Sequence, residues 1–297
     1  MSIFELTPGL LRSLPLPLPK EGSKDDRGRV LVIAGSVEVP GAALLAATAT
    51  LHAGAGKLQI ATVERAALRL AFAIPEALVI GLAETADGGV DHEAAAEKIA
   101  GSAERADAIL IGPGMTEGAG TAALTEALCA GASPTTSFVL DAAALCKLKP
   151  CARSVRALGG RAVITPHAGE MAQLLGRSRE DVEADPIRAA EEAADLLNAV
   201  VVMKGAQSHI VEAGEKIWRY KGGGIGLATS GSGDVLAGLI AGLLARGAEP
   251  AQAALWGVYL HGEAGRRLGE RSGPVGYLAR DLSAEAPALL RDIEASA

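Results

Sequence analysis

The stretch GLATSGSGDVLAG, at 226–238, places a single acid among several glycines. Apolar residues recur at helical spacing after Asp234, so Gly231, Ser232 and Gly233 are predicted to form a turn into a helix. The first N–H groups of a helix have no partner within it and, together with the helix dipole, attract an anion. Asp234 could take a proton from a hydroxyl that attacks a phosphate held there. The alternative is that Asp234 only caps the helix.

Other phosphate-binding motifs are not supported by this sequence. No lysine follows the glycines of 226–238, as the Gly-x-x-x-x-Gly-Lys-Ser/Thr loop requires. The segment GAGKLQ has a lysine, but Leu51 and Leu58 occupy the required Gly and Ser/Thr positions. The dinucleotide motif Gly-x-Gly-x-x-Gly does not occur in the chain.

A second polar cluster, in ITPHAGEMAQLLG at 164–176, lies between a predicted strand and an amphipathic helix. It contains His167 and Glu170, which we interpret as candidate site residues. The alternative is that Thr165 or Glu170 caps the helix and His167 is solvated.

A third cluster, in VVMKGAQSHIV at 201–211, places Lys204 and Ser208 at the end of a buried strand. Lys204 could neutralise a phosphate and Ser208 could hydrogen-bond to it. Both could instead be ordinary residues at the edge of a hairpin.

The elements that must position these clusters alternate along the chain. Continuous apolar strands between helices predict a mainly parallel sheet covered on both faces, which is a doubly wound α/β fold. Ligands bind such sheets outside the carboxyl ends of the strands, where all three clusters lie. The predicted strands are 29–35, 57–62, 77–82, 108–114, 137–142, 161–166 and 199–205, with an antiparallel hairpin at 209–220 at one edge. The predicted helices are 41–56, 92–105, 118–131, 181–198, 234–246, 250–268 and 281–292.

Composition restricts the classes of protein to be considered. The 297 residues carry a net charge of -7, which argues against a general binder of nucleic acid or anionic membranes. We find no domain boundary, signal peptide or membrane span, and we predict one domain over 1–297 with a lead-in at 1–25. The three cysteines have no metal-finger spacing, so we expect reduced thiols in a cytoplasmic protein.

Taken together, the motifs resemble one family. RVLVIAG, LIGPGM, VLDAAAL, VITPHAGEMAQLLG, VVMKGAQSHIV, GLATSGSGDVLAG and VYLHGEAG occur in one order, and the resemblance spans about 24–290. This pattern closely resembles the nucleotide-dependent NAD(P)H-hydrate dehydratases of the ribokinase-like superfamily. The resemblance implies a ribokinase-like fold and a metabolite-repair lyase. Such an enzyme phosphorylates the ring hydroxyl of the S-epimer of hydrated NADH or NADPH and then eliminates phosphate.

The resemblance also implies roles for individual residues. It implies a catalytic base at Asp234, with Mg²⁺ as cofactor and ADP or ATP as phosphoryl donor. The anion hole would be Gly231, Ser232 and Gly233; the hydrated dinucleotide would contact Ala42, Gly114, His167 and Asp234; and the nucleotide would contact Lys204, Gly205, Ala206, Gln207, Ser208 and Gly233.

Two departures from the family pattern stand out. Relatives usually have a second aspartate where this chain has Ala143, which puts a metal or polar role at that position in doubt. They often have Gly-Asn-Pro where this chain has Gly223, Gly224 and Ile225, which leaves open whether an asparagine contact is lost or replaced by backbone.

Two other functions remain open at this point. One is a ribokinase-like kinase of a vitamin precursor or sugar, and the other is a nucleotide-binding regulator without catalysis. Many relatives also carry an epimerase domain, for which the roughly 25 residues before the first predicted strand are too few. We therefore expect action on one epimer, a separate epimerase as functional partner, and by resemblance a homo-oligomer, with a tetramer as the candidate.

Overall fold

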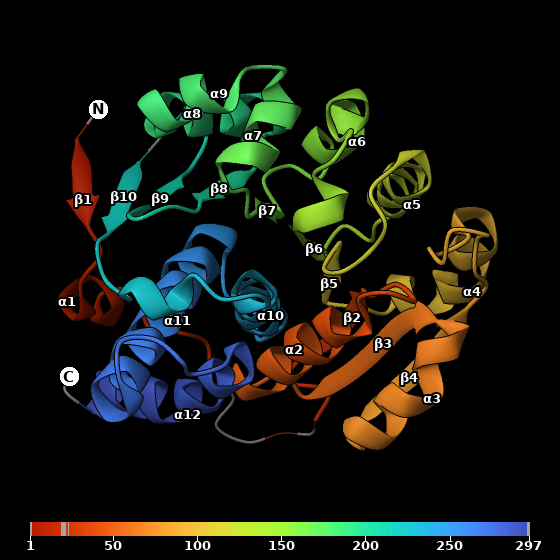
Figure 1. Ribbon diagram of the computed structural model, residues 1–297, viewed down its shortest axis with the longest axis horizontal. Helices are drawn as coiled ribbons and strands as arrows, with labels where there is room; N and C mark the ends of the chain where they lie inside the picture. Colours follow the sequence, from red (N-terminus) through yellow and green to blue (C-terminus); the bar gives the residue numbers. More distant parts are fainter. Residues whose placement is uncertain (1, 19–21, 23, 215, 296–297) are drawn as a thin grey trace.

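The strands of the computed structural model form one ten-stranded sheet (Figure 1). The structure describes residues 2–18, 22, 24–214 and 216–295. The strand order is β1-β10-β9-β8-β7-β6-β5-β2-β3-β4, and β9 is antiparallel to both of its neighbours while the other pairs are parallel. The strands are β1 (Ile3–Glu5), β2 (Arg29–Ile33), β3 (Lys57–Val63), β4 (Ala77–Leu82), β5 (Ala108–Ile111), β6 (Ser137–Leu140), β7 (Ala162–Ile164), β8 (Val200–Met203), β9 (Ser208–Val211) and β10 (Ile217–Tyr220).

Helices cover both faces of the sheet, as the sequence predicts (Figure 1). On one face lie α2 (Pro40–His52), α3 (Glu64–Ala73), α10 (Ser232–Ala245) and α11 (Pro250–Ser272), with α1 (Pro8–Arg12) and α12 (Ala279–Ala295) packed beyond them. On the other lie α4 (His92–Glu104), α5 (Ala119–Ala130), α6 (Ala152–Arg156), α7 (Ala168–Leu175), α8 (Arg179–Ala184) and α9 (Pro186–Leu197). The doubly wound α/β fold is confirmed.

Two expectations about individual elements were wrong. The hairpin β9–β10 is antiparallel but is not the edge of the sheet, because β1 pairs with β10 outside it. The lead-in thus contains a strand and also α1, whose N-cap is Thr7. The single helix expected at 181–198 is two helices, since Pro186 cannot continue a helix and Asp185 caps the second one by accepting from the Arg188 N–H at 3.1 Å.

Helices α2 and α10 pack almost backbone to backbone within one chain. A Cβ at Gly238 would lie 2.2 Å from the Ala46 carbonyl oxygen, and one at Gly242 would lie 2.5 Å from that of Thr50. Only glycine permits this approach, which accounts for the small residues of both helices. Because the contacts advance in the same direction along the two helices, from Ala46 to Thr50 and from Gly238 to Gly242, the helices run parallel and their N-termini lie at the same end of the sheet.

That end lies at a reversal in the strand order. From β2 the chain proceeds to β3 and β4 on one side, and then returns to β5 on the other side of β2. The loops after β2 and β5 meet there, where the Gly35 N–H donates to the Pro113 carbonyl at 2.8 Å. Gly112 has φ +123°, and a Cβ there would lie 1.8 Å from the Asp141 carbonyl oxygen. Doubly wound proteins bind ligands at such a point.

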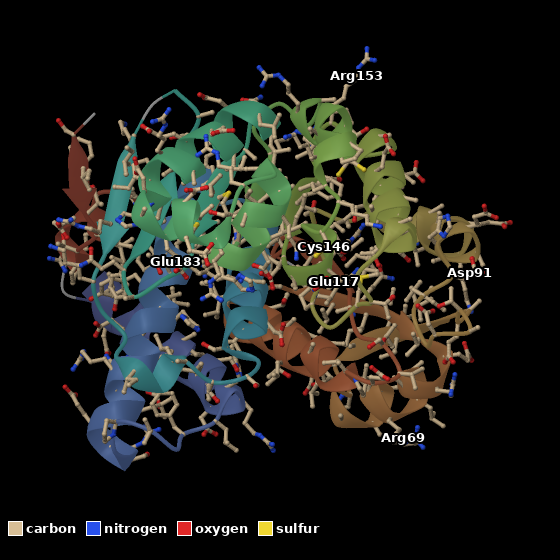
Figure 2. All side chains as sticks on the ribbon, turned by 45° about the horizontal axis from the view of Figure 1, so that its top comes forward. Arg69, Asp91, Glu117, Cys146, Arg153 and Glu183 are labelled. Carbon is tan, nitrogen blue, oxygen red and sulfur yellow. The ribbon has the colours of Figure 1, made fainter. Side chains whose placement is uncertain are left out.

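The structure also bears on the expectations of free cysteine thiols and of a chain without a membrane-spanning helix. Cys129, Cys146 and Cys151 are free thiols, and all three are buried. Burial, and then the charge of Glu117, raise the pKa of Cys146 to about 12; Figure 2 labels both residues. In the described part of the chain, no helix has both the length and the apolar character needed to cross a bilayer.

Candidate active site

The glycine-rich turn leads into α10 as predicted, with Gly231 as the N-cap. Gly231 has φ +86°, and a Cβ there would lie 2.3 Å from Cδ1 of Leu45 on α2. Both the backbone conformation and the lack of space therefore require glycine. Asp234 is the third residue of the helix and lies in its first turn. The alternative that Asp234 is the N-cap is therefore wrong.

The backbone amides of this turn are not equivalent. The Ser232 N–H donates to the Thr229 carbonyl at 3.2 Å, and the Val235 N–H donates to the Gly231 carbonyl at 3.2 Å. Gly233 and Asp234 belong to the first turn of α10, where N–H groups have no carbonyl one turn back to bind. These two amides can receive an anion, whereas the amide of Ser232 is already engaged.

A buried charged network lies at the ends of three adjacent strands, β6, β7 and β8. Lys204 Nζ donates to Asp141 Oδ1 at 2.9 Å and lies 3.7 Å from Glu170 Oε2. The Thr165 hydroxyl donates to the same Asp141 oxygen at 2.6 Å. Asp141 and Thr165 are almost fully buried. Parallel strands with neighbouring carboxyl ends bring these residues together, although they are distant in sequence.

This network extends to the start of α10. A Cβ at Gly233 would lie 3.4 Å from Lys204 Nζ, so the ammonium faces the glycine turn. A cation beside a helix N-terminus is unfavourable, because that end carries partial positive charge. An anion placed between Lys204 and the Gly233 and Asp234 amides would satisfy both, which makes this gap a candidate phosphate position.

The pKa values of the two central groups follow from this arrangement. Burial and then the charge of Asp141 raise the pKa of Asp234 to about 6, although Lys204 opposes the rise. Burial lowers the pKa of Lys204, but the charges of Asp141 and Glu170 outweigh it and the net shift is upward. Near neutral pH, Lys204 is a fixed cation and Asp234 is a carboxylate able to accept a proton.

The His167 side chain is exposed, as the alternative held, but it also makes hydrogen bonds within the chain. It is the N-cap of α7: its Nδ1 accepts from the Glu170 N–H at 3.1 Å, and the Glu170 carboxylate accepts from the His167 N–H at 2.8 Å. The alternative that Glu170 caps the helix is therefore confirmed in part: His167 is the N-cap, and Glu170 is its partner in a capping box. The His167 side chain is 59% exposed and lies at the rim of the site.

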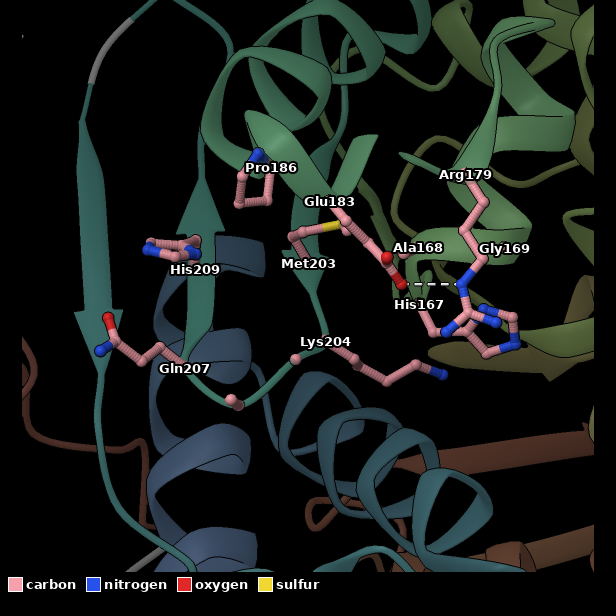
Figure 3. Close-up of a pocket in the computed structure, with 12 residues that line it drawn as sticks. His167, Ala168, Gly169, Arg179, Glu183, Pro186, Met203, Lys204, Gln207 and His209 are labelled. Carbon is pink, nitrogen blue, oxygen red and sulfur yellow. Dashed lines mark hydrogen bonds and ion pairs between the residues drawn. The ribbon is translucent and has the colours of Figure 1, made fainter. Parts of the chain in front are cut away.

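Two cavities meet at this rim and share His167 and the Lys204–Gly205–Ala206 turn. The smaller, of about 630 Å³, appears in Figure 3, where Arg179 pairs with Glu183 at 2.7 Å and Gln207 forms part of the wall. The larger, of about 930 Å³, is lined by these residues of the described part of the chain: His167, Lys204, Gly205, Ala206, Ser208, Tyr220, Lys221, Gly222, Gly224, Ile225, Leu227, Ala228, Thr229, Ser232, Gly233, Leu236, Val258, His261 and Gly262. Its size suits a nucleotide-sized ligand.

Ala42 and Gly114 are brought together but line neither of these cavities. A Cβ at Gly114 would lie 2.5 Å from the Ala42 Cβ, and Gly114 has φ +63°. Ala42 lies one helical turn before Leu45, the residue that contacts the Gly231 turn. The pair therefore flanks the start of α10 from the side of α2.

The two departures from the family pattern have different surroundings. Ala143 lies in a 3-10 turn at 142–144 and is buried in the apolar core, so its position offers no polar group to the site. Gly224 and Ile225 line the larger cavity, and Ile225 is 72% exposed there. An apolar side chain and glycine backbone thus form that part of the wall.

Sequence reasoning did not find His261. This residue of α11 lines the larger cavity, and its Nε2 lies 2.8 Å from Ser232 Oγ. It lies in VYLHGEAG, one of the motifs that carry the resemblance, but no role was predicted for the histidine itself. Thr165 was considered only as a cap of α7, which is His167 instead, and Asp141 only as part of VLDAAAL; their hydrogen bond to each other could not be predicted from spacing.

Comparison with known families places this site in context. The sequence model of the family described as NAD(P)H-hydrate dehydratase matches residues 30–288. The chain is 48% identical to the ADP-dependent (S)-NAD(P)H-hydrate dehydratase of Xanthomonas campestris, over 96% of this chain and 95% of that protein. It is 33% identical to the bifunctional NAD(P)H-hydrate repair enzyme of Escherichia coli, over 87% of this chain but only 47% of that protein.

Solved structures agree with this relationship. The fold matches the ADP/ATP-dependent NAD(P)H-hydrate dehydratase of Bacillus subtilis, co-crystallised with ATP/Mg²⁺, with a TM-score of 0.82. The two chains are 30% identical, and the match covers 99% of this chain and 100% of the other. A ribokinase-like protein from Enterococcus faecalis matches with a TM-score of 0.80 at 24% identity, which supports the fold alone.

Proposed function

This chain belongs to the NAD(P)H-hydrate dehydratase family, and from that premise we propose that it restores NADH and NADPH from their S-hydrates at the expense of ADP. The observation that carries the proposal is the approach of Lys204 to the glycine turn that precedes Asp234. A phosphate oxygen there would meet a fixed cation and the two amides that have no partner within the helix, beside a carboxylate. The name of the 48% identical relative supports ADP as the donor.

The proposed chemistry has two stages. Asp234 accepts the proton of the ring hydroxyl while that oxygen attacks the terminal phosphorus of ADP, and AMP leaves with the electrons of the broken P–O bond. The Gly233 and Asp234 amides and Lys204 hold the charge of the transferred group. The ring nitrogen then expels phosphate from the adjacent carbon, and loss of a ring proton restores the dihydronicotinamide. NAD(P)H, AMP and phosphate are the products.

Binding of the two substrates would divide between the described surfaces. The larger cavity, with Lys204 to Ala206, Ser208 and Gly233 in its wall, has room for the nucleotide, and Gln207 lies at the neighbouring wall. The hydrated dinucleotide would approach from the side of Ala42, Gly114 and His167, so that its ring hydroxyl reaches Asp234. This division places donor and acceptor on opposite sides of the phosphate position.

Magnesium fits this site as a companion of the nucleotide. Among the described residues, no group of three or more His, Cys, Asp and Glu side chains is placed to hold a metal. Mg²⁺ commonly binds through substrate phosphates with one or two carboxylates. Asp141, Glu170 and Asp234 outnumber the ammonium of Lys204 around this position, which suits a cation that arrives with phosphate. Asp141 and Glu170 would face it, and it would neutralise phosphate charge.

The experiment that tests this function is a turnover assay. Purified protein, Mg²⁺ and a mixture of the two NADH-hydrate epimers receive either ADP or ATP, and the near-ultraviolet absorbance of returning dihydronicotinamide is followed. A nucleotide-dependent rise that stops when the S-epimer is exhausted, faster with ADP, is expected. A flat trace with both donors, on protein that binds ADP, would refute the proposed function.

The remaining expectations about the surroundings of the enzyme are proposals. Because the reaction consumes one epimer, a separate epimerase activity would supply it from the other. The buried free thiols suit a cytoplasmic location. A homo-oligomer, with a tetramer as the candidate, is supported by apolar side chains exposed on α3 and the edge strand β4: Leu68 (69%), Phe72 (81%) and Leu78 (56%). Light scattering of the purified protein would test it.

A further inference from the structure

His261 is a partly buried titratable group that the proposed chemistry does not use. It projects from α11 into the larger cavity, with its Nε2 2.8 Å from Ser232 Oγ. Burial lowers the pKa of His261 to about 4; a hydrogen bond with the Ser232 backbone opposes this shift, and the charge of Lys204 adds to it. The imidazole is therefore neutral near pH 7, and it carries one N–H.

Ser232 needs an oriented hydroxyl if it is to help bind an anion. Its amide donates to the Thr229 carbonyl at 3.2 Å and is not available to a ligand. The Ser232 side chain is buried at the wall of the larger cavity, next to Gly233. Only the hydroxyl can contribute a donor, and the direction of its proton depends on the ring that it contacts.

The neutral ring offers two arrangements with opposite effects. With the proton on Nε2, the ring donates to Ser232 Oγ, and the hydroxyl proton is free to turn toward a phosphate oxygen. With the proton on Nδ1, the hydroxyl donates to Nε2, and only oxygen lone pairs are left for the cavity. Those lone pairs repel a phosphate, so a bound anion favours the first arrangement.

We propose that His261 is a positioning residue that donates from Nε2 to Ser232 Oγ, so that the serine hydroxyl becomes a third donor to the transferred phosphate. The Gly233 and Asp234 amides and the Ser232 hydroxyl then form the anion hole, in place of three consecutive backbone amides. This inference rests on the proposed function and names the partner that completes its phosphate site. His261 itself does not contact the phosphate; it acts through Ser232.

The test compares Ser232→Ala, His261→Leu, the double variant and His261→Gln. Loss of one donor to a charged phosphate lowers kcat/KM roughly 10- to 100-fold. We expect the loss mainly in kcat, with little change in the KM for the hydrate. The double variant is no worse than either single variant, because the two side chains act as one unit. His261→Gln recovers most of the activity, since its amide can donate to Oγ.

A matched control exists at the far end of α2. His52 Nδ1 lies 3.0 Å from Ser283 Oγ, and burial lowers the pKa of this histidine too. His52→Leu removes a similar pair without touching the site, so its kcat/KM stays near the wild-type value. Equal losses in His52→Leu and His261→Leu would mean that only general stability is affected, and the inference would fail.

A measurement on the wild-type protein does not depend on the folding of any variant. With ¹⁵N-labelled histidine, NMR reports which ring nitrogen of His261 carries the proton, and we expect Nε2–H when MgADP is bound. An unprotonated Nε2 in that complex would overturn the inference. Wild-type protein that binds MgADP with Nε2–H but does not turn over would instead refute the proposed function alone, so the two failures are distinguishable.

Discussion

Replacing Asp234 by asparagine should stabilise the fold while abolishing turnover. In the folded protein the pKa of Asp234 is about 6, against an ordinary value of 3.8. Because the folded-state pKa of this acid is raised, ionised Asp234 costs stability at high pH and nothing once both states are protonated. Two pKa units correspond to about 3 kcal/mol.

We therefore expect Asp234→Asn to raise the free energy of unfolding by about 2–3 kcal/mol near pH 8, and by about a third of that near pH 4.5. Urea unfolding followed by tryptophan fluorescence measures both values, since Trp218 and Trp256 are buried. Asp181→Asn is the matched control, because Asp181 is also the third residue of its helix, α8, but is exposed. It should give no stabilisation.

The same variant separates the two roles of the carboxylate. An amide cannot accept the hydroxyl proton, so kcat for Asp234→Asn should fall by a factor of about 10² or more, while the Kd for ADP changes little. Equal unfolding free energies for wild type and variant at both pH values would show that Asp234 is not strained by its surroundings. Near-normal turnover in the variant would exclude it as the base.

Three further outcomes are expected. In pH–rate profiles, kcat/KM should fall below about pH 6 as Asp234 is protonated. Asp141→Asn removes a negative charge beside Asp234 and should shift this fall to lower pH. Lys204→Met removes a positive charge and should shift it to higher pH. Gly231→Ala should lower the free energy of unfolding by about 2–3 kcal/mol through backbone strain and overlap with α2, whereas Gly224→Ala, with φ +80° and no atom within 4 Å, should cost only about 1 kcal/mol, both measured by urea unfolding. The three buried cysteines should react with a thiol reagent only as fast as the protein opens, so equal rates in folded and unfolded protein would contradict their burial.

Most of the framework could be predicted because it depends on local pattern. The apolar runs of β2 to β8 alternate with helices, and a parallel sheet covered on both faces is the arrangement that buries them. The start of α10 was found because glycine, serine and aspartate precede a run at helical spacing. The strand β1 was not predicted, since three exposed residues have no pattern of their own and pair only because β10 offers an open edge.

The interior of the site depends on contacts that no local pattern encodes. Asp141 and Lys204 are 63 positions apart, and only the strand order β6-β7-β8 places their charges 2.9 Å from each other. Ser232 and His261 are on different helices, and their contact follows from the packing of α10 on α11. The expectation that the Ser232 amide is free could not be checked from sequence either, because its acceptor, Thr229, lies in the preceding irregular turn.

The glycine turn of α10 has no lysine because Lys204, from the end of β8, supplies the positive charge at the phosphate position. A lysine in the turn would lie directly beside Asp234 at the helix start, and its charge would lower the pKa of that carboxylate. Here the cation comes from the end of β8 and is held by Asp141 on a neighbouring strand, so it reaches the phosphate position from across the gap. Lys204 also lowers the pKa of Asp234, but burial and the charge of Asp141 outweigh it and keep that pKa at about 6, near the pH at which the base must work. Because the cation is paired with Asp141 on a neighbouring strand, the first turn of α10 can bind a phosphate with its amides while Asp234 deprotonates the acceptor.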